Sequence, residues 1–89
     1  MKIKTVHTNE YICLINYLIA LRKESNISQI DMAKTLNLKQ SDISKIEIKE
    51  RRIDIYEAFQ WINKCSSNSN EVLITAYNIF LENISNEIS

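Results

Sequence analysis

The chain has neither glycine nor proline among its 89 residues, and this absence restricts its fold more than any other feature. The phosphate-binding loops of nucleotide-binding proteins and the tight turns of β-hairpins depend on glycine, which adopts positive φ angles at little cost. Helices joined by short polar turns are the architecture that remains. We therefore expect an all-α protein, and the length favours one domain over residues 1–89.

The few cysteines and histidines argue against a metal or catalytic centre. Cys13 and Cys65 have no cysteine or histidine neighbour at metal-ligand spacing, and His7 is distant from both in the sequence. We expect reduced thiols, no cofactor, no metal and no catalytic residue. The apolar stretch Tyr11–Leu21 is too short to span a bilayer and lacks a signal-peptide cleavage site, so we expect a cytoplasmic protein without a membrane partner.

Charge is unevenly distributed, although the net charge of the chain is zero. Residues 22–52 contain eight basic and five acidic side chains, a net charge of +3, whereas residues 53–89 contain one basic and five acidic side chains, a net charge of −4. A basic half is expected if one face of the protein meets nucleic acid. Random scatter of surface charge accounts for these counts equally well.

Apolar spacing and helix-start residues predict five helices. The first follows Thr8 and ends near Glu24, the second covers Gln29–Leu36, the third starts at Lys39 or Gln40 and ends at Ile46 or Glu47, the fourth runs from Asp54 to about Lys64, and the fifth covers residues 68–84. Residues 1–7 form a short N-terminal arm, and residues 65–70 are a loop rich in serine and asparagine. Capping pairs are expected at Ser28 with Asp31, Asp54 with Glu57, and Asn68 with Glu71.

The apolar residues of the helices predict which sides face a core. The first helix has two stripes, one of Ile12, Ile15 and Ile19 with Arg22 and one of Leu14, Leu18 and Leu21, and the fourth is expected to point Ile55, Ala58, Phe59 and Ile62 inward. One stripe is enough for a core, so the second stripe of the first helix is available to the fifth helix or to another subunit. Core or interface positions are expected for the aromatic residues Tyr56, Trp61 and Tyr77.

The second and third helices are separated by a turn too short for antiparallel packing, so they must cross steeply. Ala33 lies where the two helix axes approach most closely, and Asn37 occupies the turn position that requires a positive φ angle. Apolar residues that seal the junction are Met32, Leu36, Leu38, Ile43 and Ile46. These spacings indicate a helix-turn-helix unit over residues 28–47.

Three segments carry a resemblance to a known family. They are LRKESNISQ from Leu21 to Gln29, QSDISKIE from Gln40 to Glu47, and ERRID from Glu50 to Asp54. In order and spacing they resemble the Cro/C1-type helix-turn-helix regulators, which include phage repressors and regulators of the xenobiotic-response-element type. The resemblance extends over roughly residues 10–66 and implies a five-helix, lambda-repressor-like, sequence-specific domain for double-stranded DNA.

The resemblance assigns base contacts to the third helix. Gln29 is implied to bind a phosphate and to brace Gln40, whose side-chain amide can bond the N6/N7 edge of an adenine. Ser41, Ser44 and Lys45 share the exposed side of this helix, because they lie three and four residues apart. We expect these four residues from Gln40 to Lys45 to contact bases.

Two further roles follow from the resemblance. Arg22 and Glu47 match a family ion pair that fixes the angle of the recognition helix. Phosphate contacts are expected at Gln29, Lys39, Lys49, Arg51 and Arg52.

The sequence departs from the family pattern at three positions. Lys49 replaces a glycine, so either a left-handed residue costs about 1 kcal/mol there or the turn differs. Lys39 replaces the usual Ser or Thr cap. Asp42 either accepts a hydrogen bond from a cytosine or caps the third helix, and we favour capping. Lys45, which we expect to contact a base, can instead form an ion pair with Asp42 three residues earlier.

The fifth helix carries two apolar stripes, of which a small domain can bury one. One stripe is Leu73, Tyr77, Phe80 and Ile84, and the other is Val72, Ala76 and Ile79. We expect a homodimer whose interface includes Val72, Ala76, Tyr77, Ile79 and Phe80. A two-fold dimer would set two recognition helices about 34 Å apart and require a pseudo-palindromic operator.

The favoured function is therefore a homodimeric regulator, most simply a repressor. An antitoxin that also binds a toxin, or a restriction-modification controller, fits the same motif. A protein-interaction module that does not bind DNA is the alternative from another class, and an enzyme is the least supported, because there is one histidine and no identifiable catalytic pair.

Overall fold

The computed structural model describes residues 8–65 and 68–88, with side chains up to Asn83, and all regular structure in these ranges is helical. The helices are α1 (Asn9–Glu24), α2 (Gln29–Leu36), α3 (Gln40–Glu47), α4 (Ile55–Cys65) and α5 (Ser69–Ile88). The expected all-α class is confirmed. The predicted N-terminal arm, residues 1–7, lies outside the described residues.

Local capping defines most helix starts, as the sequence predicted. Side-chain oxygens accept a hydrogen bond from the backbone N–H three residues later at Thr8, Ser28, Asp54 and Asn68. At the start of α4 the bonding is reciprocal, because Oε1 of Glu57 also accepts from the N–H of Asp54 at 3.1 Å. Each of these bonds satisfies a backbone donor that the first helical turn leaves without a partner.

Three turns use left-handed residues although the chain has no glycine. Asn37, with φ of 59°, ends α2 as predicted. Lys49, with φ of 67°, takes the left-handed conformation that its position suggested. Unlike asparagine, lysine has no short side-chain amide that can bond the local backbone and offset the strain. Asn26, also with φ of 59°, was not anticipated.

The core lies where α1, α2, α3 and α4 meet. Its buried members are Ile15, Leu18, Met32, Ala33, Leu36, Ile43, Ile46, Trp61 and Ile62. Trp61 is fully buried, and its indole N–H donates to the carbonyl of Leu18 at 2.9 Å, which satisfies its single polar group. The 3% exposure of Ala33 fits the predicted close approach of α2 to its neighbours.

The inward side of α1 differs from the two predicted stripes. Its buried residues are Ile15, Leu18 and Arg22, so the buried line takes one leucine and one isoleucine from different stripes. The reason is that α1 is covered on two sides, by the helix-turn-helix and α4 on one and by α5 on the other. No single stripe therefore carries the whole core contact.

The predicted inward side of α4 was wrong at two positions. Ile55 is 71% exposed and Phe59 is 50% exposed, whereas Trp61 and Ile62 are buried. Glu57 is buried on the inward side, because an arginine pairs with its carboxylate. The apolar pattern alone predicts that Glu57 faces outward, and the inward side of α4 was therefore assigned to the wrong residues.

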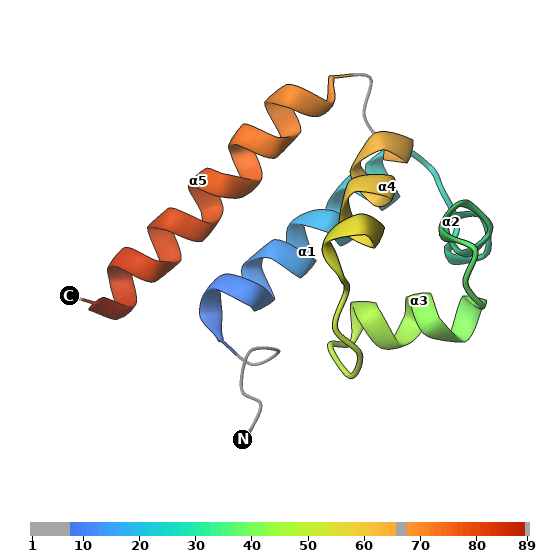
Figure 1. The fold of residues 1–89 in the computed structure, drawn as a ribbon, viewed down its shortest axis with the longest axis horizontal. Helices are drawn as coiled ribbons and strands as arrows, with labels where there is room; N and C mark the ends of the chain where they lie inside the picture. Colours follow the sequence, from blue (N-terminus) through green and yellow to red (C-terminus); the bar gives the residue numbers. More distant parts are fainter. Residues whose placement is uncertain (1–7, 66–67, 89) are drawn as a thin grey trace.

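The fifth helix is longer than predicted and lies along α1. It continues to Ile88 rather than Ile84, and Cys65 belongs to the end of α4 rather than to the following loop. Figure 1 shows α5 beside α1 on one flank of the molecule, with α2 and α3 on the opposite flank. The thiol of Cys13 in α1 donates to Oδ1 of Asn83 in α5 at 3.4 Å. Among the described residues, no helix has the length and apolar character needed to cross a membrane.

Candidate nucleic-acid interface

The second and third helices form the predicted helix-turn-helix. The left-handed Asn37 ends α2 and turns the chain, and the N–H of Leu38 donates to the carbonyl of Ala33 at 2.8 Å, which closes the end of α2. The first residue of α3 is Gln40. Ile43 in α3 is fully buried, so the opposite side of this short helix faces outward, away from α5 (Figure 1).

Four polar side chains connect the interior to the start of α3, and we call them the polar network. Arg22 donates through Nε to Oε2 of Glu47 at 2.6 Å and through Nη2 to Oε1 at 3.1 Å. Gln29 donates through Nε2 to Oε1 of Glu47 at 2.9 Å. Gln40 donates through Nε2 to Oε1 of Gln29 at 2.7 Å. The side-chain amide of Gln40 is thus held in place by a continuous series of hydrogen bonds.

The ion pair in the polar network is buried and fully bonded. Arg22 is 8% exposed and Glu47 is 9% exposed, and the third donor position of Arg22, Nη1, bonds the carbonyl of Ile27 at 2.8 Å. A buried charge is tolerated only where its hydrogen-bonding capacity is used in this way. The pair joins α1 to the last residue of α3.

Comparison with known proteins places this geometry in a family. A family model described as "Helix-turn-helix" matches residues 18–65, which is more than half of the 89 residues. The chain belongs to the Cro/C1-type helix-turn-helix family. No curated protein matches the chain significantly. The five-helix Cro/C1-type fold is lambda-repressor-like, and the family consists of DNA-binding regulators that are not typically enzymes.

The residues expected to contact bases lie together on the outer side of α3. Gln40, Ser41 and Lys45 are exposed, and Ser44 is partly exposed. An amide nitrogen carries two hydrogens, so the bond from Gln40 to Gln29 uses one of them and leaves the other, together with Oε1, to form two bonds with one base. This Cro/C1-type helix therefore presents an amide that can make a bidentate contact.

Asp42 is a capping residue, as favoured from the sequence. Its Oδ2 accepts from the N–H of Lys39, the N-cap of α3, at 3.2 Å. The carboxylate thus supplies the half of a capping box that satisfies the N–H of the N-cap residue, whereas the Lys39 side chain cannot accept a bond from the first turn. Its negative charge lies in the first helical turn, where the helix dipole favours it. The side chain of Lys39 itself is exposed.

The basic residues that flank α3 divide into two groups. The side chains of Lys39 and Arg52 are exposed, as phosphate contacts require. Lys49 instead donates through Nζ to Oδ1 of Asn16 at 2.9 Å and, more weakly, to the carbonyl of Glu47 at 3.4 Å. Arg51 points toward the start of α4, so two of the four basic residues expected to contact phosphate are engaged within the protein.

The pairing of Arg51 with Glu57 was missed by sequence reasoning. Both Nη atoms of Arg51 donate to the two carboxylate oxygens of Glu57 at 3.0 Å. The guanidinium holds the pKa of Glu57 below its ordinary value, and the carboxylate raises the pKa of Arg51. The capping pair of Asp54 and Glu57 was recognised, but Arg51 reaches that carboxylate from six residues earlier, in the non-helical segment between α3 and α4.

The residues expected at a dimer interface fall on two sides of α5. Val72 packs against the core of its own chain, and Ala76 lies beside α1 and α4. Ile79 and Phe80 are partly buried, and Tyr77 is 60% exposed. The structure therefore uses Val72 and Ala76 within one chain, because α1 needs a cover for its second side.

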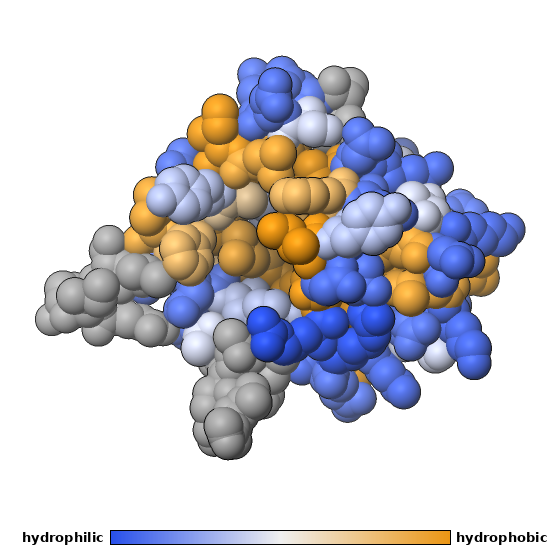
Figure 2. All heavy atoms as spheres, viewed as in Figure 1, coloured by the Kyte–Doolittle hydropathy of each residue, from blue (hydrophilic) through white to orange (hydrophobic). Residues whose placement is uncertain are grey.

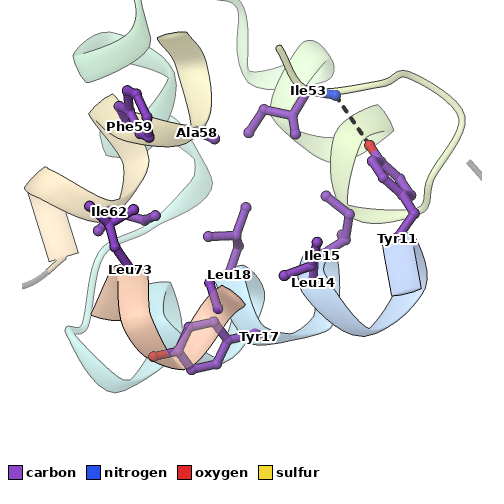
Figure 3. A pocket seen from close by; sticks show the side chains of 11 residues that line it. Tyr11, Leu14, Ile15, Tyr17, Leu18, Ile53, Ala58, Phe59, Ile62 and Leu73 are labelled. Atoms are coloured by element: carbon purple, nitrogen blue, oxygen red, sulfur yellow. Dashed lines mark hydrogen bonds between the residues drawn. The ribbon is translucent and has the colours of Figure 1, made fainter. Parts of the chain in front are cut away.

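An apolar groove of about 210 Å³ lies between α1, α4 and α5. Figure 3 shows Leu14 and Leu18 of α1, Phe59 and Ile62 of α4, and Leu73 of α5 around it. At one end, the Tyr11 hydroxyl accepts from the N–H of Ile53 at 3.2 Å. Within the described ranges, no group of acidic, cysteine and histidine side chains is arranged to hold a metal ion.

Proposed function

We propose that this protein is a sequence-specific regulator that binds a pseudo-palindromic DNA operator as a homodimer in the cytoplasm and represses transcription. The observation that carries the proposal is the position of Gln40, at the exposed start of α3 and bonded to the buried ion pair through Gln29. An enzyme would need reactive groups that converge, whereas this surface converges on a rigid amide suited to a base edge.

Base contacts are assigned to the outer side of α3. Gln40 would donate to N7 and accept from N6 of an adenine in the major groove. Ser41 and Ser44 can bond either kind of base edge, and Lys45 is long enough to reach a guanine or a phosphate. Fixing Gln40 before DNA arrives lowers the entropy lost on binding, which favours affinity as well as selectivity.

Phosphate contacts are assigned to the groups that border α3. Gln29 lies next to Gln40, and Lys39 and Arg52 present exposed cations. Lys49 and Arg51 make internal contacts, so we assign them the role of shaping the turn after α3, with phosphate binding secondary. Repression requires only that the dimer occupy its operator, because an occupied site is closed to other proteins.

Two substitutions separate base selection from general DNA affinity. Gln40→Ala should weaken binding to the preferred operator by about 1–3 kcal/mol and relax the preference at one base position. Arg52→Ala should lower the affinity for all DNA sequences alike. It should also reduce the slope of log affinity against log salt concentration by about one. Gln60→Ala is a matched control, because it makes the same change on α4, away from the outer side of α3.

The measurement is selection of bound duplexes from a random library, followed by titration at several salt concentrations. The wild-type protein should enrich a symmetric site. If no duplex is bound even at low salt, the proposed function is wrong. If Gln40→Ala keeps the full sequence preference, Gln40 is not the base-contacting residue.

A further inference from the structure

The segment between α3 and α4, residues 48–54, is tied to α1 at two points, and we call it the connector. Nζ of Lys49 donates to Oδ1 of Asn16, in the middle of α1, at 2.9 Å. Further along the connector, the N–H of Ile53 donates to the hydroxyl of Tyr11, also in α1, at 3.2 Å. Figure 2 shows strongly hydrophilic side chains gathered where the connector passes, below the apolar side chains of α4 and α5. The path of the connector beside α3 therefore depends on α1.

The ammonium group of Lys49 lies at the C-terminal end of α3. Besides Asn16, it contacts the carbonyl of Glu47, the last residue of α3, at 3.4 Å. Carbonyls in the last turn of a helix have no partner within the helix and carry the negative end of the helix dipole, so a cation is favoured there. These two contacts turn the side chain of Lys49 back onto the protein instead of outward from the connector.

The protein holds two cations of the connector, but with acceptors of different strength. Arg51 makes two hydrogen bonds to the carboxylate of Glu57, which is buried and balances its charge. Asn16 is a neutral amide at an exposed position of α1, so it gives Lys49 one hydrogen bond and no opposite charge. A neutral acceptor holds a cation less strongly than an anion does, and a DNA phosphate is an anion. Lys49 therefore keeps its positive charge and is held back mainly by one neutral side chain.

We infer that Asn16 is a positioning residue, which holds the ammonium group of Lys49 away from DNA and so limits the general affinity of the protein for duplexes. The inference rests on the proposed function and adds to it a residue of α1. Without the amide oxygen of Asn16, the ammonium group is free to reach a phosphate beside α3. A phosphate contact acts on all sequences alike, so Asn16 lowers unselective binding without involving the base contacts of α3.

Asn16→Ala should therefore raise DNA affinity, which is the opposite of what the loss of a structural contact does. Releasing one cation should steepen the slope of log affinity against log salt concentration by about one. At about 0.1 M salt this corresponds to a gain of up to roughly tenfold, equal for a selected operator and for an unrelated duplex. A purely structural role would instead displace α3 and lower the affinity for the operator alone.

The measurement is titration of both duplexes at several salt concentrations, with the folding of each variant checked by circular dichroism and urea unfolding. Asn78→Ala is the matched control, because it makes the same change at an exposed position of α5, and its slope should equal that of the wild type. Asn16→Asp keeps an acceptor for the ammonium group and should show no gain. Combined with Lys49→Gly, Asn16→Ala should change nothing further, because no ammonium group is left to release.

The outcomes separate this inference from the proposed function. A uniform gain in affinity that requires Lys49 would support the inference. A salt slope for Asn16→Ala that is unchanged or shallower, an equal gain in Asn16→Asp, or a gain that persists beside Lys49→Gly would overturn it and leave the proposed function intact. A wild type that binds no duplex at low salt would overturn the proposed function, and this inference with it.

Discussion

Removal of the Glu47 carboxylate is the most direct test of the polar network. Glu47→Ala deletes the acceptor of three hydrogen bonds, at 2.6 and 3.1 Å from Arg22 and 2.9 Å from Gln29. Arg22, 8% exposed, would keep its charge with only the carbonyl of Ile27 as partner. Breaking a buried pair in this way costs about 3–5 kcal/mol, a large fraction of the 5–15 kcal/mol that stabilises a typical domain.

Urea unfolding measures this loss, with the midpoint and the slope recorded separately so that a change in compactness is not mistaken for a change in stability. Arg22→Ala should cost a similar amount. The double variant Arg22→Ala with Glu47→Ala should cost less than the two single changes added together, because it leaves no unpaired buried charge.

Two outcomes would contradict a buried pair whose members depend on each other. If Glu47→Ala destabilises the protein by less than about 1 kcal/mol, the pair behaves as a solvated surface pair. If the single costs add in the double variant, Arg22 and Glu47 do not act as a unit. Either result would remove the argument that the interior fixes the angle of α3.

Two further predictions concern the turn after α3 and the pairing of Arg51. Lys49→Gly should be more stable than Lys49→Ala by about 1 kcal/mol in urea unfolding, because φ is 67° there and both variants lose the bond to Asn16 equally. The depressed pKa of Glu57 adds stability that is fully present above its ordinary pKa of 4.5 and is lost as pH falls through the lower folded value. Arg51→Gln should reduce this acid sensitivity in unfolding measured across that range, and an unchanged pH profile would show that the pairing contributes nothing.

Much of the fold followed from local signals in the sequence. The caps at Ser28 and Asn68 act within one helical turn, so the sequence alone locates them. The left-handed Asn37 is set by the short turn between two helices. The contact of Arg22 with Glu47 came from family resemblance, because 25 residues separate them and no local rule joins them.

The remaining features depend on which element covers which. Ile55 and Phe59 point outward because the side of α4 that carries Glu57 faces inward, where Arg51 pairs with its carboxylate. The periodicity of apolar residues cannot reveal a buried ion pair. The two stripes of α5 are equally apolar in the sequence. Only the position of α1 decides that Val72 and Ala76 belong to the interior and Tyr77 to the surface.

The series of hydrogen bonds from Arg22 to Gln40 has an evolutionary consequence. Two of its members, Arg22 and Glu47, are hidden from solvent, yet they determine where the amide of Gln40 lies. Under the proposed function, inherited changes around these hidden residues are expected to shift which operators a descendant recognises, even when every residue proposed to touch the duplex is retained. Operator choice in such descendants would then have to be traced inward as well as along the proposed contact surface.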